Sequence, residues 1–124
     1  MLLEEELTSK VIGAAIEVHK HWGPGLYEDI YERSLCHELD LMGIPHESQL
    51  SLPLHYKGVK VGEDFKCDVF VDGKVVVENK AVKELMPVHE AQLLTYMKLL
   101  NVRVGILINY NVDILKKGIR RMVL

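Results

Sequence analysis

The chain has 124 residues, of which 48% are hydrophobic and 27% charged, and its formal net charge at pH 7 is −3. This length and composition are typical of one domain with a proper core, and we expect a single domain over residues 1–124. The slight acidity excludes a protein that holds nucleic acid through a generally basic surface. Such binding would need a local basic patch, or a metal ion that offsets clustered carboxylates.

Targeting signals are not expected in this chain. No apolar run reaches the length of a membrane span, and the start is acidic, at Glu4, Glu5 and Glu6, where a signal peptide would be basic. Cys36 and Cys67 do not form a Cys-x-x-Cys pair and are expected to be reduced thiols. These features favour a cytoplasmic protein with no membrane partner.

Two helices are expected first. The spacing of apolar residues predicts an amphipathic helix over 3–22, ended by Gly23-Pro24-Gly25, and a second helix over 27–42, ended by Gly43. The stripe expected to be buried on the first helix contains Leu3, Leu7, Val11, Ala14, Ala15, Val18 and Trp22. The apolar face of the second contains Tyr27, Ile30, Tyr31, Leu35, Leu39 and Met42.

The remainder alternates between strands and helices. A strand is expected over 47–56, where Pro53 marks an edge or an irregularity, and Pro87 suits the first turn of a later helix. The further elements are strands at 65–71 and 74–79, a helix at 87–100, a strand covered on both faces at 102–109, a short helical or irregular piece at 114–117 and a strand at 119–123. The order ααβββαββ predicts an α/β fold with a mixed central sheet flanked by helices.

The hairpin around Asp72-Gly73 contains unexpected charges. Asp-Gly between two β-rich runs is a strong hairpin signal, but it does not explain Asp68, Glu78 and Lys80. Alternation places Glu78 and Lys80 on one face, and a loop with an odd number of residues, such as a type I turn with a bulge at Gly73, adds Asp68 to it. We predict the odd loop, with four valines (Val69, Val71, Val75 and Val77) as core on the other face.

Two carboxylates and an ammonium group on one patch favour a divalent-metal site with a charged neighbour. An Asp, about ten residues and then Glu-x-Lys also resembles the pattern of the PD-(D/E)xK nuclease superfamily. The resemblance implies a restriction-endonuclease-like core. It further implies that Asp68 and Glu78, with the backbone carbonyl of Asn79, bind Mg²⁺ or Mn²⁺, and that Lys80 positions and helps deprotonate water or stabilises developing charge.

A second motif begins at Gly25 and reads Gly-x-x-Glu-x-x-Tyr. Gly25 is a candidate helix N-cap, and Glu28 in the first helical turn would interact well with the helix dipole. The motif and the preceding segment 12–19 also resemble the GxxExxY family, which is placed within the same superfamily. That resemblance covers nearly the whole chain and implies that Glu28 assists through a metal-bound water or binds a second metal.

A third motif lies on the helix expected over 87–100. Gln92 and Tyr96 share a helix face beside its core stripe, with His89 adding to the same polar edge. They are either a solvated face with a partly buried tyrosine or functional residues. Gln-x-x-x-Tyr after Glu-x-Lys resembles the lambda-exonuclease-like branch, in which these residues help to position the phosphate and the charged groups of the site.

The function implied is metal-dependent hydrolysis of a phosphodiester in nucleic acid, with DNA favoured over RNA, by a protein that we expect to form a homodimer or to need a partner. The alternatives are a catalytically inactive module that binds nucleic acid or protein, and a structural ion-pair network around Lys80. The basic tail (Lys116, Lys117, Arg120 and Arg121) is either a solvated terminus or a contact for nucleic acid. The six histidines lack the spacing of a zinc site.

Overall fold

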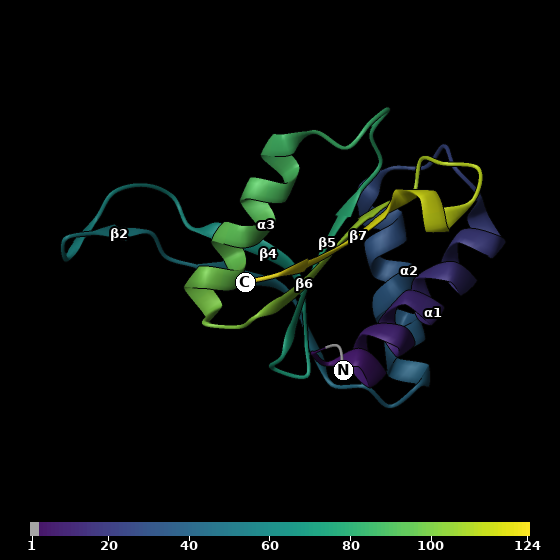
Figure 1. Cartoon of the computed structure of the whole chain (residues 1–124), viewed down its shortest axis with the longest axis horizontal. Coiled ribbons are helices and arrows are strands. Elements are labelled where there is room, and N and C mark those ends of the chain that lie inside the picture. Colours follow the sequence, from purple (N-terminus) through teal and green to yellow (C-terminus); the bar gives the residue numbers. More distant parts are fainter. Residues whose placement is uncertain (1–2) are drawn as a thin grey trace.

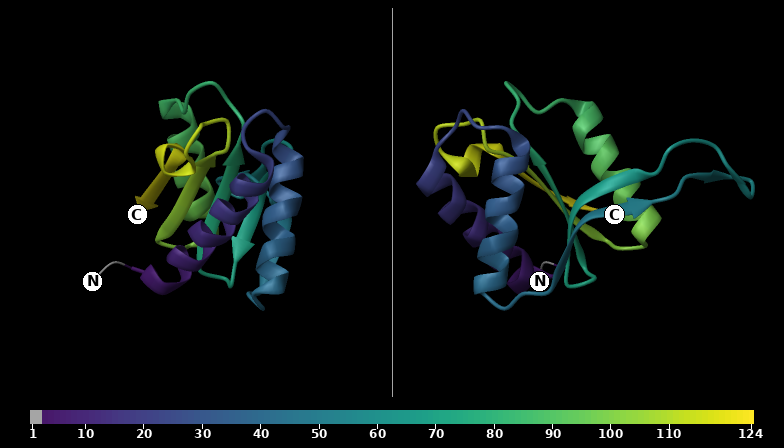
Figure 2. Two further views of the ribbon diagram at one scale, coloured as in Figure 1. Left: turned by 90° about the vertical axis from the view of Figure 1, so that its right-hand side faces the viewer. Right: turned by 180° about the vertical axis from the view of Figure 1, so that it is seen from behind.

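The computed structural model describes residues 3–124 and contains a five-stranded sheet between two helices on one face and one on the other (Figures 1 and 2). The chain order is α1 (Glu5–Trp22), α2 (Glu28–Leu41), β1 (His46–Leu52), β2 (His55–Tyr56), β3 (Val59–Lys60), β4 (Phe65–Val71), β5 (Val75–Lys80), α3 (Pro87–Leu100), β6 (Val104–Asn109), the 3₁₀ turn η1 (Leu115–Gly118) and β7 (Ile119–Val123). The mixed α/β architecture is the predicted one.

The sheet has the strand order β1-β4-β5-β6-β7. Neighbouring strands are antiparallel except β5 and β6, which are parallel because α3 carries the chain from one end of the sheet back to the other. Every residue of β6 is buried, as predicted for a strand covered on both faces. No helix within residues 3–124 is both long enough and apolar enough to cross a membrane.

Two cores follow from this arrangement. The larger packs α1 and α2 against one face of the sheet and includes Val11, Leu35 and the four predicted hairpin valines. The smaller lies under α3 and contains Leu93 and Met97. The hairpin prediction is therefore confirmed for its apolar face.

The hairpin loop is odd, as predicted, but its turn differs from the suggested type. Val71 pairs with Val75, which leaves three residues in the loop. The Lys74 N–H donates to the Val71 carbonyl at 2.9 Å, and both central residues, Asp72 and Gly73, have positive φ angles, of 50° and 64°. These angles match a type I′ turn, whose twist suits a hairpin better than that of a type I turn.

Several helix-end predictions were wrong. Leu3 and Trp22 are 40% and 46% exposed, and Tyr27 and Met42 are 83% and 44% exposed, so the buried stripes are shorter than expected. The N-cap of α2 is Tyr27 rather than Gly25, since Gly25 lies in the preceding loop with a φ angle of 109°. The last turn of a helix is often exposed to solvent, and apolar periodicity alone does not show at which residue the buried stripe ends.

The strand expected over 47–56 is divided at Pro53. Its first part is β1 in the main sheet, while its second part, β2, pairs only with β3. Proline supplies no N–H for the ladder, so pairing with β4 stops there. Together β2 and β3 form an extension that leaves the sheet (Figure 1).

Substitution of Gly118 should be strongly destabilising. A Cβ atom there would lie 2.1 Å from the Asn109 carbonyl oxygen, which is backbone and cannot rotate away. We expect Gly118→Ala to lower the free energy of unfolding by about 3 kcal/mol or more, measured by urea denaturation. Gly13→Ala is the control, since nothing lies within 4 Å of its Cβ and alanine favours the exposed middle of α1. An equal loss in both variants would contradict this account.

Candidate metal-dependent active site

The candidate site lies where β4 and β5 stop pairing. The last paired residues are Val69 and Val77. Beyond this pair, hydrogen bonds from backbone to side chain replace the backbone–backbone hydrogen bonds between the two strands. The Asp68 N–H donates to Glu78 Oε1 at 3.1 Å, and the Asn79 N–H donates to Asp68 Oδ2 at 2.8 Å. Asp68 and Glu78 are therefore brought together and fixed by backbone donors.

The sheet is irregular at Asp68. Val69 packs in the larger core whereas Cys67, two residues away, packs under α3, so the regular alternation of faces breaks between them. Opposite this point, Gln49 of β1 has a φ angle of 51°, which is uncommon for a residue other than glycine. The irregularity allows Asp68 to approach α2 on one side while it remains bonded to β5 on the other.

Burial raises the pKa of both carboxyl groups above their ordinary values. For Asp68 the largest cause is desolvation, which the Asn79 N–H and the positive charge of Lys80 oppose. For Glu78 the causes are desolvation and then repulsion by Asp68, again opposed by Lys80. The three predicted hairpin residues thus influence one another: the raised pKa values favour a proton on the carboxyl pair when no cation is bound, and the positive charge of Lys80 opposes this protonation.

Glu28 lies at the rim of this site. It lines a cavity of about 450 Å³ with Asp68, Gln49 and Glu32, and its own side chain is exposed. Glu28 is therefore on the same side of the sheet as Asp68, at the first turn of α2. The cavity that both carboxylates line is large enough for water or a ligand.

Glu32 and Gln49 belong to the same cluster, and neither residue was predicted from the sequence. Gln49 Nε2 donates to both carboxylate oxygens of Glu32 at 2.9 Å and lies 3.4 Å from Asp68 Oδ1. Burial, and secondarily the Asp68 charge, raises the pKa of Glu32 to about 7. The spacing of four from Glu28 could have indicated Glu32. Nothing local in the sequence indicates Gln49.

The predicted α3 residues lie on the other side of the sheet. Tyr96 is partly buried, and its ring packs against Phe65 with centroids 5.6 Å apart. Burial, followed by the charges of Glu78 and Asp68, raises the pKa of Tyr96 to about 12, so its hydroxyl keeps its proton at neutral pH and can donate a hydrogen bond. Gln92, one turn earlier, is exposed and forms no hydrogen bond within the described residues.

The tyrosine of the Gly-x-x-Glu-x-x-Tyr motif is structural. Tyr31 is fully buried, and its hydroxyl donates to the Gly23 carbonyl at 2.6 Å. Its ring stacks on Tyr110 with centroids 4.4 Å apart. The Tyr110 hydroxyl donates to Asn79 Oδ1 at 3.1 Å, which connects the motif to the residue beside Glu78.

A magnesium ion fits this set of donors as an ion held by one or two carboxylates, with water as its other ligands. Within residues 3–124, no three His, Cys, Asp or Glu side chains form a metal-binding group by themselves. Mg²⁺, however, is usually bound through one or two carboxylates and keeps several waters. Asp68 Oδ1 and Glu78 Oε2 are not used by the backbone donors. The Asn79 carbonyl lies on the same strand edge as its N–H, which bonds to Asp68.

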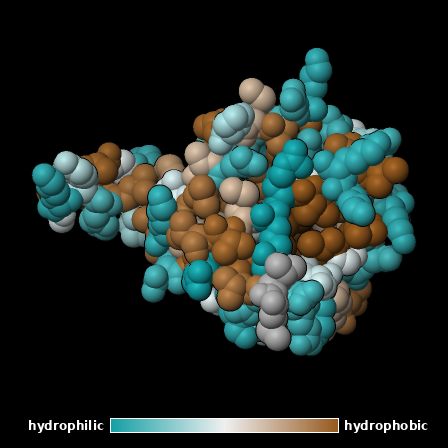
Figure 3. All heavy atoms as spheres, viewed as in Figure 1, coloured by the Kyte–Doolittle hydropathy of each residue, from teal (hydrophilic) through white to brown (hydrophobic). Residues whose placement is uncertain are grey.

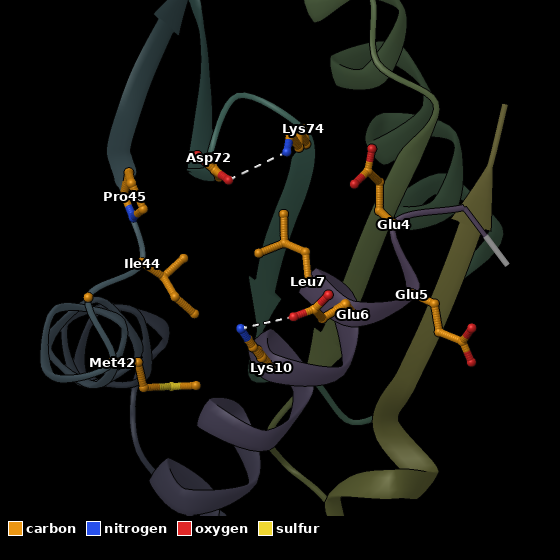
Figure 4. Close-up of a pocket in the computed structure, with 11 residues that line it drawn as sticks. Glu4, Glu5, Glu6, Leu7, Lys10, Met42, Ile44, Pro45, Asp72 and Lys74 are labelled. Atoms are coloured by element: carbon orange, nitrogen blue, oxygen red, sulfur yellow. Dashed lines mark ion pairs between the residues drawn. The ribbon is translucent and has the colours of Figure 1, made fainter.

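The largest cleft is elsewhere and does not contain these residues. Its volume is about 610 Å³, and it lies beside the β4–β5 turn. Its charges are largely paired, with Lys10 3.4 Å from Glu6 and Lys74 3.7 Å from Asp72 (Figure 4). Glu4 and Glu5 also line the cleft and form no ion pair within residues 3–124, and they lie apart from the cluster at Asp68.

The comparisons with known proteins agree with the geometry. The family model of the PD-(D/E)XK nuclease superfamily matches residues 5–122. No curated protein and no solved structure matched significantly. The family match covers almost the whole chain, including the strands that carry Asp68, Glu78 and Lys80. This chain belongs to the PD-(D/E)XK nuclease superfamily.

Proposed function

We propose that the protein is a nuclease that hydrolyses phosphodiester bonds with Mg²⁺ or Mn²⁺, and that it belongs to the GxxExxY group in the lambda-exonuclease-like branch of its superfamily. The observation that carries the proposal is the pair of Asp68 and Glu78, held together by backbone N–H groups beside Lys80. Burying two carboxylates side by side is costly unless a cation compensates them. A site for a cation explains why the fold retains them.

Asp68, Glu78 and the Asn79 carbonyl would hold the metal, with Glu28 contributing through water or a second ion. When bound, the metal supplies a water of lowered pKa and neutralises charge on the phosphate. Lys80 would orient the attacking water and stabilise negative charge as the phosphorus becomes five-coordinate. Its positive charge lowers the pKa of both carboxyl groups, although within the described residues Lys80 forms no ion pair with either of them.

Tyr96 and Gln92 would orient the scissile phosphate from α3. The raised pKa of Tyr96 keeps its hydroxyl protonated, so the side chain can donate a hydrogen bond to a phosphate oxygen at neutral pH. Gln92 lies one turn before Tyr96 on the same helix face, with its side chain exposed. Both are positioning residues in this mechanism.

Lys80→Ala is the experiment that tests the proposal. We expect Mn²⁺-dependent cleavage of plasmid or of single-stranded DNA by the wild type, and a fall of about 10²-fold or more in the rate with Lys80→Ala, because charge stabilisation in the transition state is lost. Mn²⁺ binding, measured by calorimetry, should persist. Lys74→Ala, in the exposed loop of the same hairpin, should cleave normally. Unchanged cleavage by Lys80→Ala would rule out the mechanism.

A catalytically inactive module is the second candidate. It is favoured by the absence, within residues 3–124, of a complete three-residue metal group. In that case the wild type would bind nucleic acid but neither bind Mn²⁺ nor cleave. Calorimetry of the wild type distinguishes the two candidates directly.

A further inference from the structure

An arm formed by residues 53–64 extends away from the sheet. Its strands β2 and β3 pair with each other through His55–Lys60 and Tyr56–Val59, and with no strand of the main sheet. Figures 1 and 3 show the arm standing clear of the body, and every residue from 55 to 63 is exposed. An isolated two-stranded ribbon is only marginally stable in water. The arm therefore adds surface to the protein and contributes little to its core.

The outer part of the arm has the opposite charge to the protein. Residues 53–62 contain Lys57, Lys60 and no acidic residue, whereas the whole chain has a formal charge of −3. The two acidic residues of the arm, Glu63 and Asp64, lie at its base. Lys60 Nζ is 3.0 Å from Asp64 Oδ1 in a largely exposed pair of the kind that contributes little. Lys57 forms no ion pair within the described residues, so the tip presents positive charge.

The turn at the tip is unfavourable for lysine. Lys57 and Gly58 have φ angles of 49° and 84°, and the flanking residues Tyr56 and Val59 pair directly, as in a type I′ turn. The first position of this turn favours Asn, Asp or Gly, and a lysine there costs about 1 kcal/mol. Lys57 Nζ lies 5.3 Å from the centroid of the Tyr56 ring, an exposed cation–π contact that contributes about 0.5–1 kcal/mol and offsets most of this cost. The charge and position of Lys57, and not strain in the turn, therefore indicate the role of its side chain.

The arm begins next to the candidate site. It connects the end of β1 to Phe65 at the start of β4, three residues before Asp68, which is a distance of about 10 Å along the strand. Phe65 also packs against Tyr96. The arm itself can reach about 20 Å further. A nucleic acid that occupies the site and continues towards β1 would pass along the arm.

The arm is a two-stranded β-ribbon, and such a ribbon fits the grooves of some nucleic acids and not of others. The major groove of B-form DNA is about 12 Å wide and admits a two-stranded β-ribbon. The major groove of A-form RNA is too narrow and deep for side chains to read, and a single strand has no groove. We propose that the arm enters the major groove of duplex DNA bound across the site, with Lys57 contacting a phosphate. This inference rests on the proposed function, and it narrows the substrate to duplex DNA.

A second copy of the chain is a less suitable partner. The exposed apolar side chains of the arm are those of Tyr56, Val59 and Val61. A stable dimer buries about 800 Å² on each subunit, which three side chains of this size cannot supply. The positive tip would also meet an identical positive tip in an arm-to-arm contact. Charge complementarity therefore favours the phosphate backbone.

Lys57→Asn is the most informative variant, since asparagine suits the left-handed turn and removes the charge. Binding is measured by fluorescence anisotropy with a labelled duplex of about 30 base pairs, about three helical turns, over a series of salt concentrations. We expect roughly fivefold weaker duplex binding, and a slope of log K against log salt that is smaller by about one. Single-strand binding should not change, and Lys57→Arg should retain duplex binding.

Replacement of residues 55–60 by Gly-Gly removes the paired part of the arm. The body should fold normally, because β2 and β3 pair only with each other, and thermal unfolding checks this. Weaker duplex binding in both this variant and Lys57→Asn supports the proposal. Duplex binding that is unchanged in both, or absent from the wild type, overturns it. Loss of a dimer in sedimentation velocity, with duplex binding intact, also overturns it and identifies the arm as a subunit contact.

Hydrolysis of bis(p-nitrophenyl) phosphate separates this inference from the proposed function. The compound is too small to reach the arm, so both arm variants should hydrolyse it at the wild-type rate. If the wild type does not hydrolyse it or DNA, the nuclease function fails, but the duplex-binding comparison still decides the role of the arm. If hydrolysis is normal in the variants and duplex binding is also unchanged, only the arm proposal fails.

Discussion

Asp68→Asn is expected to abolish Mn²⁺ binding and to reduce DNA cleavage by at least about 10²-fold, while raising the thermal stability of the metal-free protein. The amide oxygen can still accept the hydrogen bond from the Asn79 N–H, so the local geometry can be retained. What is lost is the negative charge. Because burial and neighbouring carboxylates raise the pKa of Asp68 and Glu78, that charge destabilises the metal-free fold.

Asp72→Asn is the matched control for this variant. Asp72 lies four residues further along the same hairpin in an exposed left-handed turn position that asparagine accepts equally well. It should leave metal binding, cleavage and thermal stability unchanged. Calorimetry, a cleavage assay and thermal unfolding measure the three properties. If Asp68→Asn melted at a lower temperature, the carboxylate would be a structural partner of Lys80, as in the ion-pair alternative.

The second large effect concerns pH. Without metal, the protein should become less stable as the pH rises from about 4.5 to about 7, because the folded Glu32 carboxyl, with a pKa of about 7, holds its proton more tightly than the unfolded group does at 4.5. The sign follows from this difference, since the folded state binds more protons throughout the interval. Glu78, whose pKa is also raised, adds to the same trend.

The Glu32 contribution alone amounts to about 1 kcal/mol after solvent screening, because its side chain is only half-buried. Urea unfolding at several pH values measures the trend, and Glu32→Gln should flatten it. Mg²⁺ or Mn²⁺ should restore stability at pH 7 by binding only the folded, ionised cluster. Stability that increases through this interval in the metal-free protein, and is unaffected by Glu32→Gln, would contradict the described environment of Glu32.

Local features predicted much of the fold. The odd loop at Asp72-Gly73, the burial of the four valines and the bounds of α3 all followed from alternation, turn chemistry and proline preference. The hairpin also brings Asp68 next to Glu78, because adjacent strands of a tight hairpin are neighbours in space whatever the rest of the chain does. Parity did not predict the orientation of Asp68, since the alternation of faces breaks between Cys67 and Val69.

Other predictions depended on contacts that sequence does not encode locally. The exposure of Trp22 and Tyr27 depends on how the last turn of α1 and the first turn of α2 pack against the rest of the protein. The expected strand divides into β1 and β2 because β4 pairs with the residues before Pro53 and not with those after it. In both cases the residue type is compatible with either environment, and only packing decides.

The sequence by itself determined the α/β class, the hairpin that carries Asp68, Glu78 and Lys80, and the motifs that resemble the superfamily, because these rest on short-range periodicity and spacing. The tertiary structure alone decided the strand order, the loss of pairing at Asp68, the approach of Glu32 and Gln49 to that residue, and the free extension of the arm. These features join segments far apart in the chain, and their geometry is fixed by the packing of α2 and β1 against β4, not by any local preference.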